Sequence, residues 1–385
     1  MKIIIIIFLS LLFVNFFGAT AINNTILLGL ILPFVVFSLS KRTLFKNHIL
    51  FVIGGLICSI ISCYFFRDQP MLITFKNSAS YFYILFYFML RYINPTIKQI
   101  ESAIFILTVI LCSCYAIQYA VYPKVIFSGA EKDYGDDVRI RLVGQGFSSL
   151  GYFLGINKYL RTKRLIYVAL SIFCFIIIFL MGFRTMLALI LVFTVFLIVK
   201  VNGINWKFLI YSLFGILSLL VILQVPIIAD KVDNMLGRQE TQNFGNQNYI
   251  RIIQFKYFTQ NHFKNVIEFF FGSGYPSRGT EVTSYGVQMQ RLLDMGITWV
   301  DFGLISISWI IGIPTVIAMV AYAIKAYKIT VPTSYVYLGI WFIYLVSASF
   351  TTAEFIRPGN FIVQSLALFL IEKISRTYKQ KSINS

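Results

Sequence analysis

Charged residues are scarce in this chain, and acidic residues are the scarcest. Of its 385 residues only 15 are Asp or Glu and two are His, and charged residues make up 12% of the chain against 58% hydrophobic residues. Soluble domains carry about 25% charged and about 45–50% apolar residues. The composition therefore excludes an ordinary soluble domain and predicts a polytopic membrane protein.

Several chemical signatures are absent from the sequence as well. Neither a phosphate-binding glycine loop followed by lysine nor a dinucleotide-binding glycine fingerprint occurs. The five cysteines lie inside apolar runs without His or acidic residues at ligand spacing, which indicates buried thiols and no metal site. We therefore expect neither a metal ion nor another cofactor.

Long apolar runs make up most of the sequence. A helix that crosses a bilayer needs about twenty mostly apolar residues. About twelve runs approach this length, centred on residues 3–18, 25–39, 49–66, 73–90, 100–121, 147–160, 165–182, 185–199, 208–229, 299–323, 335–350 and 361–374. The sequence predicts an all-α, polytopic integral membrane protein with about twelve transmembrane helices in a single transmembrane domain, residues 1–385.

The net charge of +18 follows this predicted topology. With the N-terminus in the cytoplasm, the loops on that side hold 18 of the 33 basic residues but only two acidic ones, Glu101 and Glu372. The positive-inside rule thus accounts for almost all of the excess charge. Both termini are predicted to be cytoplasmic, and nucleic-acid binding loses its support.

Two long polar segments fall on the external side, residues 122–146 and residues 230–298. The second is the large external loop, and its pattern predicts short helices within it. Because most of the polar sequence lies here, we expect the chemistry of the protein to occur outside the cytoplasm.

Arg184 stands at the start of an apolar helix, directly after Gly182 and Phe183. A cation at a helix N-terminus opposes the helix dipole, whereas an anion there is favoured by the dipole and by free amides. An arginine beside this end therefore makes sense if a phosphate or carboxylate completes the site. The alternative is an anchor that snorkels to the membrane surface.

Residues 246–264 of the external loop are predicted to form a helix. Arg251, Gln254, Phe258 and His262 share one face of it. Such a mixed polar and aromatic stripe suits a sugar phosphate, with His262 as a polar surface residue of that stripe rather than a catalyst. A solvated surface helix is the alternative.

Asp301 lies on the helix that re-enters the membrane after the external loop. Arg291, Asp294 and Thr298 share its face. Acidic groups at this depth are costly and usually line a wet cavity. Asp301 is therefore a candidate general base or a partner for an arginine, and the alternative is an ion pair that only fixes the loop.

Two weaker signals accompany these residues. Gly272 and Gly274 permit close approach of the backbone to a ligand, although a simple turn also contains glycine. Arg139 and Arg141 are candidate phosphate binders, although nearby acids can neutralise them, namely Glu131, Asp133, Asp136 and Asp137.

The order of these motifs resembles the Wzy-type polysaccharide polymerases and O-antigen ligases. The resemblance covers residues 139–315 by motif and the whole chain by topology. Its elements are the Arg141-x-x-Gly-x-Gly-Phe segment, the Gly-Phe-Arg184-Thr helix start, Arg251 on an external helix, the Gly272-x-Gly274 turn, and Asp301-Phe302 followed after nine residues by Gly312. The ligase pattern has His where Asp301 stands, which favours a polymerase over a ligase.

The resemblance implies a metal-independent, inverting glycosyltransferase of the GT-C type in the bacterial cytoplasmic (inner) membrane. The implied substrate is an undecaprenyl-diphosphate-linked oligosaccharide of O-antigen, capsule or exopolysaccharide synthesis, and the implied partners are a flippase and a chain-length regulator. Arg184 and Arg251 are implied to clamp the diphosphate, with Asp301 as base or orienting group. The implied substrate-binding residues are Arg139, Arg141, His262, Gly272, Gly274, Tyr275, Arg278, Arg291 and Asp294.

Two other classes of protein stay open. A lipid-linked oligosaccharide flippase or similar transporter usually shows internal repeats and paired helices broken by Gly or Pro, which we do not find here. A non-catalytic membrane scaffold leaves the placement of Arg184 and Arg251 unexplained. We therefore interpret the external loop as a half-site that closes over a diphosphate held against Arg184.

Overall fold

The computed structural model describes residues 1–15, 24–40, 42–127, 140, 142–204, 250–277 and 282–383, with the backbone alone at residues 301 and 381–383. Within these ranges the secondary-structure elements are all helices, joined by turns and loops, and there is no strand. The all-α class is thereby confirmed.

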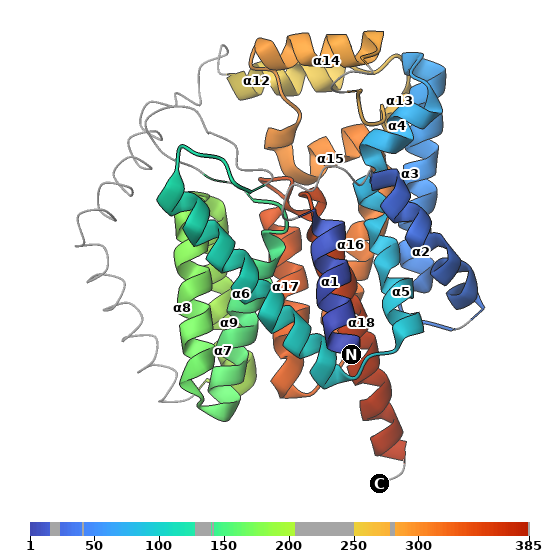
Figure 1. Cartoon of the computed structure of the whole chain (residues 1–385). Helices are drawn as coiled ribbons and strands as arrows, with labels where there is room; N and C mark the ends of the chain where they lie inside the picture. Colours follow the sequence, from blue (N-terminus) through green and yellow to red (C-terminus); the bar gives the residue numbers. More distant parts are fainter. Residues whose placement is uncertain are drawn as a thin grey trace.

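A bundle of helices runs between the two ends of the molecule (Figure 1). Its members are α1 (Lys2–Val14), α2 (Asn24–Leu39), α3 (Lys46–Arg67), α6 (Ile97–Val121), α7 (Gly146–Thr162), α8 (Leu165–Leu180), α9 (Arg184–Asn202), α16 (Ile313–Lys328), α17 (Val336–Ala348) and α18 (Asn360–Ile383). These helices cover most of the predicted apolar runs, because each run is long enough for several turns and carries few charges.

Three of these helices, α3, α6 and α9, are long and apolar enough to cross a membrane. Shorter apolar helices occupy Lys2–Val14, Asn24–Leu39, Leu165–Leu180 and Thr333–Ala348. The predicted number of about twelve spanning helices is therefore not confirmed within the described residues. The predicted run 208–229 lies outside them.

Two predicted runs are interrupted, which explains part of the shortfall. The run 73–90 is divided into α4 (Met71–Ser78), the 3-10 helix η1 (Ala79–Leu85) and α5 (Phe86–Ile93). The run 299–323 is divided between α15 (Gly303–Ile311) and α16 by Gly312, whose φ of 86° no helix interior allows. Hydropathy reports the apolar character of such segments and is insensitive to these breaks.

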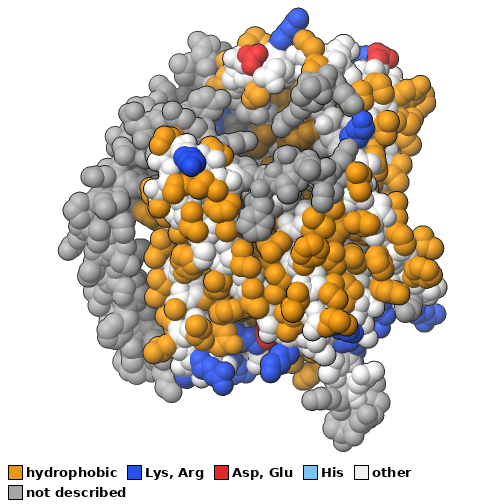
Figure 2. Space-filling view, in the orientation of Figure 1, with side chains coloured by type: hydrophobic (Ala, Val, Ile, Leu, Met, Phe, Trp, Pro, Cys, Tyr) orange, Lys and Arg blue, Asp and Glu red, His pale blue; other side chains and the backbone are white. Residues whose placement is uncertain are grey.

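Basic side chains gather at one end of the bundle, the lower end in Figure 2. We call this end the basic end and define it by Lys2, Lys46, Arg91, Lys158, Lys325, Lys373 and Arg376. Glu372 pairs there with Arg91 at 2.8 Å and with Arg376 at 2.6 Å. Both termini lie at this end (Figure 1). The residues predicted to share one side of a membrane thus do share one end of the structure.

The opposite end is covered by short helices of the predicted external loop (Figure 1). They are α12 (Ile250–Lys256), the π-helical turn η2 (Tyr257–Asn261), α13 (Val266–Phe271) and α14 (Ser284–Asp294). We call this set the roof. The 3-10 turn η3 (Val300–Phe302) leads from it into α15, η4 (Thr333–Tyr335) precedes α17, and η5 (Glu354–Ile356) lies between α17 and α18.

The turn after α13 depends on two glycines for close packing. A Cβ atom on Gly272, whose φ is 87°, would lie 2.5 Å from Ile310 O and from Gly312 N, and one on Gly274 would lie 2.4 Å from the Cβ of Cys63. The Gly274 N–H donates to Ile310 O over 2.9 Å. Close packing against other protein atoms therefore explains the need for glycine at both positions, and the approach of these glycines to a ligand stays a prediction.

We predict that Gly272→Ala destabilises the fold by on the order of 2 kcal/mol, since it adds a clash with backbone to a strained φ. Gly54→Ala is the matched control, because a Cβ at this helical glycine meets no atom within 4 Å. Thermal melting of both purified variants in detergent measures the difference. Equal melting temperatures would contradict this role for Gly272.

Candidate functional site

A cavity of about 760 Å³ lies between α14 and the neighbouring ends of the bundle helices. Its wall comes from α4 and η1, the segment before α7, the turn after α13, α14, and the link between α17 and α18. The lining residues are Asn77, Ser80, Tyr81, Leu142, Val143, Gln145, Tyr275, Ser277, Val282, Gly286, Gln290, Leu293, Thr298, Trp299, Val300, Ala353, Ile356, Arg357 and Pro358. Residues far apart in the sequence thus converge on one space.

Arg357 is the one residue with a charged side chain among these described lining residues. The other polar groups are the side-chain amides of Asn77, Gln145 and Gln290 and several hydroxyl groups. Amides and hydroxyls both donate and accept hydrogen bonds, whereas a guanidinium group only donates. The described wall therefore favours a ligand that combines hydroxyl groups with a negative charge.

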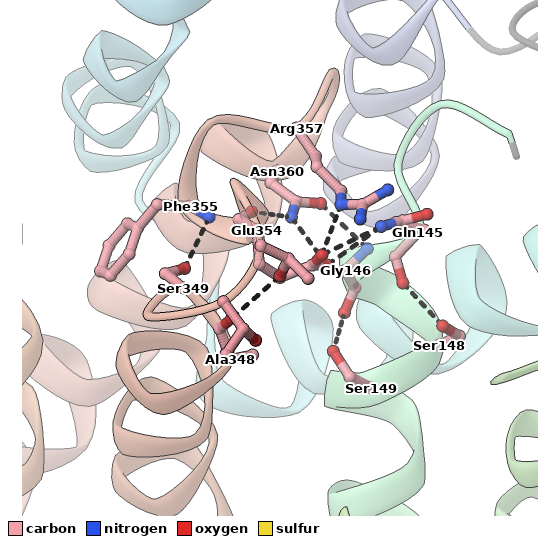
Figure 3. Close-up of polar contacts among 12 residues, drawn as sticks. Gln145, Gly146, Ser148, Ser149, Ala348, Ser349, Glu354, Phe355, Arg357 and Asn360 are labelled. Carbon is pink, nitrogen blue, oxygen red and sulfur yellow. Dashed lines mark hydrogen bonds and ion pairs between the residues drawn. The ribbon is translucent and has the colours of Figure 1, made fainter. Parts of the chain in front are cut away.

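Glu354, in η5, holds the guanidinium group of Arg357 in place (Figure 3). Arg357 Nε lies 2.5 Å from Glu354 Oε2, and the carboxylate of Glu354 is 1% exposed. On its other side, Arg357 Cζ lies 4.5 Å from the centre of the Phe183 ring. Figure 3 shows the rest of the guanidinium group extending away from Glu354. The contact is an ion pair without hydrogen-bond geometry at Nε, and no described residue accepts a hydrogen bond from the Arg357 side chain, so its Nη hydrogens are available to another acceptor.

Two side-chain amides complete the surroundings of Glu354. Gln145 Nε2 donates to both carboxylate oxygens, over 3.2 and 3.1 Å. Asn360 Nδ2 donates to the backbone oxygen of Glu354 over 2.6 Å, while Asn360 Oδ1 accepts from the N–H of Gly146 over 2.9 Å. The start of α7, η5 and the start of α18 are thereby joined, and Glu354 is used to position Arg357 instead of facing the cavity.

Three aromatic rings stand in sequence along another part of the wall. The ring centres of Tyr81 and Tyr275 lie 5.7 Å apart at 73°, and those of Tyr275 and Trp299 lie 6.1 Å apart at 84°. Edge-to-face rings of this kind present apolar faces beside polar hydroxyl and indole groups. Such a surface suits a sugar ring, whose C–H faces are apolar and whose rim carries hydroxyl groups.

The roof is fixed to the end of α3 by Arg67. This buried arginine pairs with Glu268 of α13, donates to the backbone oxygen of His262, and lies with its Cζ 5.0 Å from the centre of the Tyr285 ring. A buried arginine that lost Glu268 would leave an uncompensated charge, which typically costs about 3–5 kcal/mol. The roof is therefore an anchored part of the fold.

Gln69 provides a second anchor next to Arg67. Its Nε2 atom donates to Tyr275 O over 2.9 Å and to Thr74 Oγ1 over 2.7 Å. Its Oε1 atom accepts from the N–H of Ser277 and the hydroxyl of Thr283, over 2.9 and 2.8 Å. One fully buried amide thus ties both sides of the cavity wall to the α3–α4 link.

The arginines predicted to clamp a diphosphate are not brought together. Arg184 is half-buried at the first residue of α9, directly after the Phe183 ring that contacts Arg357. Arg251 is exposed on α12 and lines a separate open groove of about 510 Å³ with Phe255 and Lys256. Arg184 thus follows a residue that contacts Arg357, whereas Arg251 lines a groove other than the 760 Å³ cavity.

The other predicted residues have varied positions. Tyr275 lines the cavity. Arg291 and Asp294 are exposed on α14, where Asp294 Oδ1 accepts from Gln290 Nε2 over 2.9 Å. Asp301 belongs to η3, and its side chain lies outside the described part of the structure. Arg139, Arg141 and Arg278 also lie outside the described residues.

His262 differs from the prediction of a polar surface residue. It is 2% exposed and packs against the rings of Phe258, Phe263 and Tyr285. The aromatic residues of η2 and the following segment enclose it because they turn toward Trp309, whose ring stacks on Phe258 at 5.0 Å. The helix prediction treated this face as exposed, since the sequence does not show what packs against it.

The sequence analysis missed Glu354, Arg357, Arg67 and Glu268. For the first two a signal exists, because Glu354 and Arg357 stand three residues apart in a short polar link between two apolar runs. Arg67 and Glu268 offer no such signal, since their pairing joins residues 201 positions apart.

Comparison with known proteins leaves the family of the chain open. No family model matches the sequence, and a search of curated proteins finds no match. The case for a function rests on the residues and their geometry.

We predict that His262 makes the roof sensitive to acid. Burial, and to a lesser degree the charge of Arg67, lowers the pKa of His262 to about 3, whereas an unfolded histidine has a pKa near 6.5. Between these two pKa values His262 binds a proton in the unfolded chain but not in the folded chain. The folded state therefore loses up to about 1.4 kcal/mol per pH unit as the pH falls from about 6 toward 3.

Thermal melting between pH 7 and pH 4 tests this prediction. His262→Phe keeps a ring in the same place and removes the titrating group, so its stability is expected to fall less steeply with acid than that of the unsubstituted protein. Parallel pH profiles of the two proteins would show that His262 does not contribute.

Proposed function

We propose that the protein polymerises lipid-diphosphate-linked oligosaccharide repeat units on the external face of the bacterial cytoplasmic membrane. The observation that carries the proposal is the cavity opposite the basic end, with the guanidinium group of Arg357 held in its wall by buried Glu354. The cavity combines a cation for a diphosphate with amide, hydroxyl and aromatic groups for sugars. Its position matches that expected for a glycosyl transfer outside the cytoplasm.

The orientation follows from the charges. Lysine and arginine residues are enriched on the cytoplasmic side of membrane proteins, so the basic end faces the cytoplasm and the roof faces outward. The helices α3, α6 and α9 are long and apolar enough to cross the bilayer, and in this proposal shorter and interrupted helices supply further spans. The cavity under α14 then lies at the outer surface, where a membrane-bound lipid diphosphate can reach it.

The chemistry assigns one role to each part of the wall. The acceptor hydroxyl attacks the anomeric carbon of the donor sugar, and the bond between that carbon and the diphosphate oxygen breaks. The hydroxyl proton passes to a base, for which Asp301 is the candidate, and the lipid diphosphate leaves. Its developing negative charge is stabilised by the Nη atoms of Arg357, with Arg184 as a second cation.

Tyr81, Tyr275 and Trp299 support the sugar side of the proposal. Their rings line the cavity beside the amides of Asn77 and Gln290. An oligosaccharide packed on these rings is oriented with its hydroxyl groups toward polar partners. Positioning of this kind is a large part of the work in a transfer between two bound substrates.

We predict that Arg357→Ala lowers the rate of polymer formation about 100-fold or more, the usual cost of removing one positioned donor from a developing anion. Arg357→Lys keeps the charge without the bidentate fork and should retain part of the activity. Arg161→Ala is the matched control, because Arg161 is exposed in the last turn of α7 and does not line the cavity. The readout is the glycan ladder in cells that lack the native gene, normalised to inserted protein.

Further variants separate the predicted clamps. Arg184→Ala should share the loss of Arg357→Ala, whereas a loss in Arg251→Ala would assign the open groove on α12 to the same reaction. Normal ladders from Arg357→Ala and Arg184→Ala would overturn the proposal that arginines at this cavity stabilise the diphosphate.

Leaflet-resolved labelling of the repeat units distinguishes a polymerase from a flippase. Loss of a polymerase leaves single units attached to the final acceptor, because the units still cross the membrane. Loss of a flippase strands the units on the cytoplasmic leaflet. Stranded units in the Arg357→Ala strain would therefore replace the proposed function with transport.

A further inference from the structure

On the short helix α13 the charged residue is buried and apolar residues are exposed, which is the reverse of a surface helix in water. Its one charged residue, Glu268, is fully buried against Arg67. Its outward face carries Val266 and Phe270, which are 80% and 45% exposed, with Ile267 and Phe269 exposed at the sides. A helix at a protein surface in water turns its charged residues outward and its apolar residues inward.

The helix α13 packs against α3, which also exposes apolar side chains. The exposed large residues of α3 are all apolar or aromatic, at spacings of six, four, three and one residues: Phe51, Ile57, Ile61, Tyr64 and Phe65. This spacing places them on one face of a helix that is long and apolar enough to cross a membrane. The contact with α13 lies at the Arg67 end of α3 (Figure 1). The exposed residues of α13 are therefore expected to have the same apolar surroundings as those of α3.

The neighbouring helix α14 has the opposite arrangement. Its buried residues are Tyr285, Gly286, Met289 and Leu292, and all of its charged residues and glutamines are exposed, together with Val287 and Leu293. This is the pattern of a helix that lies on a protein surface in water. Two short helices of the same roof thus indicate two different surroundings.

We propose that α13 lies in the outer leaflet of the bilayer, with Val266 and Phe270 among the lipid acyl chains, whereas α14 stands in water. The boundary between lipid and water then passes between them. Two exposed, charged side chains at this level, Lys264 and Asp68, lie 3.9 Å apart and belong at the headgroups. The proposal depends on the presence of a bilayer and is independent of the polymerase activity.

This placement also explains why Glu268 is paired so completely. Besides Arg67, the Glu268 carboxylate accepts from the N–H of Lys264 over 2.7 Å. A carboxylate beside acyl chains has no water to solvate it, so it requires partners from the protein. The same pair that anchors the roof therefore permits α13 to sit in lipid.

Site-directed fluorescence measures the surroundings of both helices. The background is the full-length Cys58→Ser protein, since the other four cysteines are buried. It receives Val266→Cys or, as the control, Gln288→Cys. Each single cysteine introduced in this way is labelled with an environment-sensitive fluorophore. The proteins are reconstituted in phosphatidylcholine vesicles with or without a nitroxide on the upper acyl chain. The label on Val266→Cys should emit at shorter wavelength and lose emission to the lipid nitroxide, while that on Gln288→Cys should respond to aqueous iodide instead.

Two results would overturn the proposal. Quenching of the Val266→Cys label by iodide, as strong as that of the Gln288→Cys label, would place α13 in water. Shielding from both quenchers, lost when the protein is diluted in detergent, would show that a second copy of the chain covers α13 in place of lipid.

Discussion

A buried charge in apolar surroundings needs an opposite charge and hydrogen bonds, and this requirement determines how the elements of the protein are joined. Three ion pairs show it. Glu372 joins α18 to α5 through Arg91, Arg67 joins α3 to α13 through Glu268, and Glu354 fixes Arg357 in the link before α18. Each buried carboxylate is 1% exposed or less. With so few acids in the chain, these pairs mark the places where position matters.

The pair of Glu354 and Arg357 differs from the other two because its arginine can also contact a ligand. Glu372 and Glu268 hold arginines between elements of the fold, whereas Glu354 holds an arginine that also forms part of a cavity wall. Gln145 and Asn360 fix the carboxylate from two further elements. A side chain held in this way loses little conformational entropy when a ligand binds, so its contacts contribute more of their energy to binding.

The sequence was sufficient for the features that depend on local composition. Hydropathy located the helices of the bundle, and the Lys and Arg residues that it assigned to one side, such as Lys2, Arg91 and Lys373, do meet at one end. It also selected Tyr275, which lines the cavity. These features depend on consecutive residues or on the charge of one loop, so they can be predicted without knowing which distant residues are in contact.

The features that depend on pairing between distant residues could not be read in the same way. The sequence shows Gly272 and Gly274 but does not show that Ile310 and Cys63 pack beside them. His262 looks exposed until Trp309 is seen to stack on its neighbour Phe258. The helix α13 is only six residues long, so its run Val-Ile-Glu-Phe-Phe-Phe is too short for a hydropathy window. That its charged residue is buried and its apolar residues are exposed becomes visible only when Arg67 is seen opposite Glu268.

The separation of Arg67 and Glu268 along the chain has a consequence for biogenesis. In the proposed membrane topology α3 enters the bilayer long before Glu268 is synthesised, because Glu268 stands 201 positions after Arg67 and translation adds about 5–20 residues per second. During that interval Arg67 can reach the lipid headgroups with its long side chain. Glu268 has a shorter side chain on an apolar helix and cannot reach the headgroups in the same way. In the proposed orientation the contact between α3 and α13 therefore forms late, when synthesis of Glu268 provides the partner of Arg67.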